Sequence, residues 1–109
     1  MNKTIILDGR EVSFSANGAT PMIYKMAFQE DLLVVLQKGE EGIYDALPKL
    51  AYIMAMQAEG RMSNLGNADM IAWLSQFEAL TIEMAGEEII EVFYDQQKTS
   101  VDSKKKIIE

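Results

Sequence analysis

Residues 50–56 read Leu-Ala-Tyr-Ile-Met-Ala-Met and form the longest apolar run of the chain. The run is far below the roughly 18 residues that a membrane-crossing helix needs. Apolar residues recur around it at the spacing of one helical face, at positions Leu47, Leu50, Ala51, Met54 and Ala58. Because Tyr52, Ile53 and Met56 fill the flanks, this helix is apolar on nearly every side. We therefore expect it at the centre of the fold, with Asp45 as its cap and Pro48 in its first turn.

Asp8-Gly9 separates two short segments, residues 3–7 and 10–15, that are rich in β-branched and aromatic residues. An Asp-Gly pair supplies the two positive φ angles of a type I′ turn, so the pattern predicts a β-hairpin. An isolated hairpin is marginal in water, and this one must pack on a helix or extend its sheet with another copy. We expect self-association through residues 3–15, which a strict monomer at high concentration in light scattering would contradict.

Thr20-Pro21 has the form of a helix cap followed by proline at the first helical position. It predicts a helix over residues 21–37, ended by Gly39 and Gly42. The apolar residues of this helix form two faces, which indicates contacts on two sides.

Asn67 is predicted to cap a third helix, and Thr81 a fourth over residues 82–97. Gly86 is a plausible break, and the sequence leaves open whether these two are one kinked helix. The fold class is thus α+β and mostly α, with a short N-terminal β-hairpin followed by a bundle of three to four helices. We expect one globular domain over residues 1–98 and a flexible polar tail over residues 99–109.

Histidine and cysteine are both absent from the chain. This removes the commonest general acid–base group, the thiolate nucleophile and the usual zinc ligands. Glu87 and Glu91 lie one helical turn apart and could jointly hold a divalent cation; the simpler interpretation is a solvated helical face. We expect no enzyme activity, no metal and no cofactor.

The net charge is −7, and residues 62–97 carry seven acidic residues without a lysine or arginine. Such a surface repels a phosphate backbone, so we expect no nucleic-acid partner. The acidic segment is either a solvated face or a docking surface for a basic partner. The apolar run at residues 5–7 is too short for a signal peptide, and the expected location is the cytoplasm.

Eight methionines are more than a chain of 109 residues usually holds. They are either flexible core filler or an adaptable surface for a varied partner. Trp73 is likewise either a core anchor or an exposed binding residue. The candidate partner-binding residues are Tyr24, Phe28, Leu32, Met54, Met56, Trp73 and Phe93.

Four segments are arranged in a familiar order: the β-segment over residues 3–15, a helix with Tyr24-Lys25 at its start and an acidic-leucine centre, the apolar helix at residues 50–56, and Trp73-Leu74 followed by an acidic C-terminal helix. This layout resembles the tail assembly chaperones of long-tailed, siphovirus-type phages and prophages of Gram-positive bacteria. The resemblance covers most of the chain.

That resemblance implies a protein that binds and solubilises the tape-measure protein in the host cytoplasm before the tail tube polymerises, and that is absent from the mature virion. It also implies a longer, frameshifted product that engages the tail tube protein. Lys104-Lys105-Lys106 fits an A-rich slippery stretch; a nucleotide sequence without a slippery heptamer would remove that hypothesis.

Two other classes compete with this interpretation. An acidic regulatory protein, such as an antitoxin or a nucleic-acid-mimicking inhibitor, would use residues 62–97. A secretion-type chaperone would share the acidity and the methionines. The neighbouring gene discriminates between the three classes. A tape-measure gene supports the tail assembly chaperone, a nuclease or toxin gene supports the regulatory protein, and secretion machinery supports the secretion-type chaperone.

Overall fold

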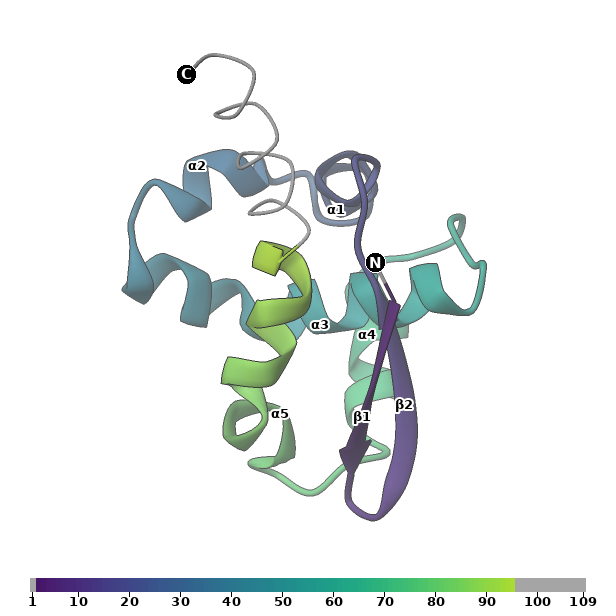
Figure 1. Cartoon of the computed structure of the whole chain (residues 1–109). Helices are drawn as coiled ribbons and strands as arrows, with labels where there is room; N and C mark the ends of the chain where they lie inside the picture. Colours follow the sequence, from purple (N-terminus) through teal and green to yellow (C-terminus); the bar gives the residue numbers. More distant parts are fainter. Residues whose placement is uncertain (1, 96–109) are drawn as a thin grey trace, which may run out of the picture.

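The N-terminal hairpin forms at the predicted place and leads into helices that surround one central helix (Figure 1). The computed structural model describes residues 2–95, so the tail expected over residues 99–109 lies outside it. The strands are β1 (Asn2–Leu7) and β2 (Arg10–Ser15). The helices are α1 (Thr20–Phe28), α2 (Leu32–Leu36), α3 (Glu40–Ala58), α4 (Asn67–Leu74) and α5 (Thr81–Met84), with a further helical segment over residues 86–95. The expected α+β, mostly α fold is confirmed.

The two strands pair antiparallel around the Asp8-Gly9 turn. Asp8 has φ 52° and Gly9 has φ 77°, the positive values that a type I′ turn requires. Alternation along the strands buries Ile5 and Phe14 on one face and leaves Ile6 61% exposed on the other. The hairpin therefore packs by a single apolar face.

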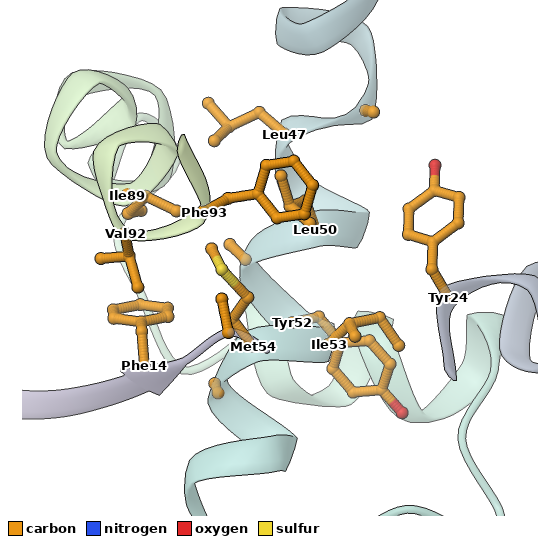
Figure 2. Close-up of a cluster of buried hydrophobic side chains, with 14 of the residues drawn as sticks. Phe14, Tyr24, Leu47, Leu50, Tyr52, Ile53, Met54, Ile89, Val92 and Phe93 are labelled. Carbon is orange, nitrogen blue, oxygen red and sulfur yellow. The ribbon is translucent and has the colours of Figure 1, made fainter. Parts of the chain in front are cut away.

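Helix α3 is the central element, as the sequence predicts. Every residue from Leu50 to Gln57 is buried, because β2, α1, α2, α4 and α5 all pack against this helix. Figure 2 shows Tyr24 on one side of α3, with Phe14 and Phe93 on the other. A helix without a polar face is stable in water only when it is enclosed in this way.

The prediction of a single helix over residues 21–37 is wrong. Helix α1 ends at Phe28, and Gln29 has φ 57°, in the left-handed region. The Asp31 side chain then accepts a hydrogen bond of 3.0 Å from the Leu33 amide and caps α2. An aspartate bonded to the backbone in this way begins a new helix instead of continuing the previous one.

The start of α3 also differs from the prediction. The helix begins at Glu40, five residues before the expected cap Asp45, and Gly39 precedes it with φ 77°. Pro48 lies inside the helix rather than in its first turn. Gly42, expected as a helix breaker, lies inside α3. Glycine lets α2 approach closely at this position, since a Cβ there would lie 2.2 Å from the Val35 carbonyl oxygen.

Helices α4 and α5 are separate, and the expected fourth helix is interrupted at Ala85, next to Gly86. A Cβ on Gly86 would lie 2.9 Å from Cδ2 of Leu47, so glycine allows this segment to approach α3. Residues 96–97 of the expected helix are outside the described range. Thr20, Asn67 and Thr81, all predicted as caps, are instead the first residues of their helices. The hydroxyls of Thr20 and Thr81 bond to distant side chains.

Replacing Gly42 with alanine tests the contact between α2 and α3. Alanine at a helix interior usually stabilises by about 1 kcal/mol relative to glycine. Here we expect the free energy of unfolding to fall by about 1–3 kcal/mol, because the new methyl group collides with the Val35 carbonyl. Urea unfolding measures the change. Gly18→Ala is the control, since a Cβ at Gly18 meets no atom within 4 Å; a gain in stability for Gly42→Ala would contradict the close approach.

Candidate protein-binding site

Six of the seven residues proposed from the sequence as partner-binding are core residues. Their exposed fractions run from 0% to 7%, at Tyr24, Leu32, Met54, Met56, Trp73 and Phe93. The seventh, Phe28, is half-buried beside the aromatic rings of Tyr24 and Tyr52. In this fold the six buried side chains do not reach the surface.

Trp73 is an anchor of the core. Its ring lies 6.5 Å from Phe14 on the hairpin, 6.2 Å from Tyr52 on α3 and 5.0 Å from Phe77, measured between ring centroids. Edge-to-face and tilted pairs of this kind add to the burial of apolar area. The core interpretation of Trp73 is therefore confirmed.

Polar side chains connect the loops to α3. The buried Thr20 hydroxyl donates to Oε1 of Gln57 at 2.6 Å, and Nε2 of Gln57 donates to Oδ1 of Asn17 at 3.1 Å. Every buried side-chain nitrogen and oxygen within residues 2–95 has a hydrogen-bond partner. These bonds hold the loop after the hairpin against the C-terminal end of α3.

Two aspartates serve as further connections. Asp8, in the hairpin turn, accepts bonds from the Thr81 hydroxyl at 2.6 Å and the Glu78 amide at 2.9 Å, and these bonds lower the pKa of the Asp8 carboxyl. Asp69 on α4 accepts a 2.5 Å bond from the Tyr52 hydroxyl, which lowers the pKa of the Asp69 carboxyl. Burial, followed by this bond, raises the pKa of Tyr52 to about 12.

Three of the exposed methionines lie near one another. Met22 and Met26 lie one turn apart on α1 and are 61% and 65% exposed. Met62, in the loop after α3, is 56% exposed and lines the same hollow of about 180 Å³ as Met26. We call Met22, Met26 and Met62 the methionine surface. The core interpretation of the methionines is confirmed for Met54 and Met56, which are buried. The partner-surface interpretation stays a prediction for the exposed methionines.

A second apolar surface lies between the start of α3 and residues 86–95. It is a groove of about 440 Å³, lined by Gly39, Glu40, Ile43, Tyr44, Glu87, Ile90, Glu91 and Tyr94. Tyr44 and Tyr94 are 46% and 41% exposed, although aromatic side chains usually bury most of their area. We call this the acidic groove, because three carboxylates and no cation line it.

The sequence reasoning proposed no residue of either surface as partner-binding, although it singled out Glu87 and Glu91 of the groove as a possible cation pair. A signal for the groove was present: Ile90 and Tyr94, like Glu87 and Glu91, are spaced by one turn and therefore lie along adjacent stripes of one helix. The methionine surface had no comparable signal, because its residues come from α1 and a distant loop.

Comparison with protein-family models, curated proteins and solved structures returned no match. Among the helices of residues 2–95, none combines the length and the apolar character needed to span a bilayer. In the same range, no three carboxylates are grouped so that they would hold a metal ion.

The hydrogen bonds of Asp8 and Asp69 lead us to expect a loss of stability in acid. Their folded pKa values lie below 3.8, so the unfolded chain binds more protons at low pH. The stabilisation is complete above 3.8 and is lost as the pH falls through the folded values. Urea unfolding between about pH 6 and pH 3 should show that the free energy of unfolding falls as the pH falls. The double variant Asp8→Asn, Asp69→Asn should show a smaller decrease over the same range. An unchanged slope in the variant would contradict the assignment.

Proposed function

We propose that this chain is a phage tail assembly chaperone, which binds and solubilises the tape-measure protein before tail tube polymerisation. The observation that carries the proposal is the methionine surface, which stays exposed although the core around α3 is closed. Single exposed apolar residues are ordinary, but Met26 and Met62 line one hollow and Met22 lies one turn from Met26 on α1, so the three form an apolar patch.

The chemistry of this surface suits a long helical partner. A helix presents its apolar residues as a stripe whose details change along its length. Unbranched thioether side chains adapt to such variation, because they repack at low cost. The exposed Met22 and Met26 lie one turn apart, the spacing at which two helices can pack side by side.

Several weak contacts along one chain would add up if copies of the chaperone associate. Within residues 2–95, the sheet consists of β1 and β2 alone, so each strand has one neighbour in the sheet. We propose that copies associate through residues 3–15, with Ile6 exposed on the outer face of the hairpin. This contact would space the methionine surfaces of successive copies along the tape-measure protein.

The proposal places the protein in the host cytoplasm and outside the mature virion, since a chaperone departs as tube subunits arrive. A frameshifted longer product would bring the tail tube protein to the same complex. Net charge −7 keeps copies of a partner-loaded chaperone soluble.

Co-expression with a phage tape-measure protein tests the function. We expect the soluble fraction of that protein to rise several-fold when the chaperone is present. The double variant Met22→Gln, Met26→Gln should lose most of this effect, because glutamine keeps the length of the side chain and its helix propensity but not its apolar character.

Met84→Gln is the matched control, because Met84 is 84% exposed and lies outside the methionine surface. It should solubilise the partner as well as the wild-type chain does. A partner that stays insoluble with the wild-type chain would refute the proposed function, and equal effects of the two variants would remove the methionine surface from it.

A further inference from the structure

We propose that the acidic groove binds a basic amphipathic helix, in which an apolar stripe is flanked by lysine or arginine. This inference rests on the proposed function and extends it, since it names a second contact and the chemistry of the partner segment that fills it. The groove and the methionine surface share no residue, so each can be tested without disturbing the other.

Apolar and aromatic side chains from two elements line the groove. Ile43 of α3 is 5% exposed and, with the half-buried Ile90, forms the base. Tyr44 and Tyr94 line the groove from α3 and from residues 86–95 respectively. An apolar trough between two helices is the shape into which a third amphipathic helix packs its apolar face.

The charges around this trough select the partner. Glu40, Glu87 and Glu91 line the groove, and the lining residues include no lysine or arginine. Glu91 has a weak ion pair, 4.0 Å from Lys3, with both side chains well exposed. The carboxylates repel an acidic segment and attract a basic one. The exposed faces of Tyr44 and Tyr94 add cation–π sites for lysine or arginine.

The same charges argue against a second copy of this chain as the occupant. Each copy carries a net charge of −7, and residues 62–97 contain no cation. Two copies that met at this groove would bring like charges together, which opposes association. A basic helix from another protein removes that repulsion.

The experiment uses the full chain and three designed helical peptides. The first has a leucine stripe flanked by lysines, the second has the same stripe flanked by glutamates, and the third is a scramble of the first with the same charge and no stripe. Fluorescence anisotropy measures the dissociation constants at moderate salt. We expect the lysine-flanked peptide to bind at least about tenfold more tightly than either of the others.

Variants of the chain locate the binding. Glu87→Lys and Tyr94→Ser should each weaken binding of the lysine-flanked peptide by about tenfold. Glu88→Lys is the matched control, because it makes the same charge change one residue away on an exposed side chain that does not line the groove. It should retain most of the wild-type affinity. Circular dichroism checks that all variants are folded.

Three results would overturn the inference: similar binding of the three peptides, equal losses for Glu87→Lys and Glu88→Lys, or a dimer that Tyr94→Ser dissociates, which would assign the groove to a second copy. A different result would refute the chaperone proposal. A partner that stays insoluble in co-expression, with peptide binding intact, removes the chaperone role and leaves the groove. Lost peptide binding with full solubilisation removes only the groove.

Discussion

The C-terminal half of helix α3 can be buried on every side only because other elements pack against each of its faces. From Leu50 to Gln57 it presents no exposed residue, so it has no stable position in water outside this enclosure. The hairpin, α1, α2, α4 and α5 supply the enclosure and are individually short. A short helix or a lone hairpin is marginal by itself, so the stability of each surrounding element depends on the contact with α3.

Polar bonds at the ends of the surrounding elements determine where each one packs. Asp8 joins the hairpin turn to the start of α5, and Asp69 joins α4 to the Tyr52 hydroxyl on α3. Thr20 joins the start of α1 to Gln57. The side chains left on the surface include carboxylates, methionines and tyrosines. That combination suits contact with another protein, and it is the basis of the function we propose.

The hairpin and the central helix could be predicted because their signals are local: Asp8-Gly9 specifies a turn, and residues 50–56 specify a helix that must be buried. The helix boundaries could be predicted less well from the sequence. Gly42 is needed inside a helix to admit the Val35 carbonyl, and that contact exists only in the folded chain. The candidate site was missed for the same reason. Met54 and Met26 are equally apolar in sequence, and only their packing assigns one to the core and the other to the surface.

Methionine oxidation tests most directly the claim that α3 is enclosed while the methionine surface stays open. The folded chain would be treated with hydrogen peroxide, and the rate of sulfoxide formation would be measured at each methionine by mass spectrometry. The account predicts fast oxidation at Met22, Met26, Met62 and Met84, and slow oxidation at Met54 and Met56, with the difference lost in urea. Oxidation of Met54 and Met56 in the folded protein as fast as that of Met26 would contradict it.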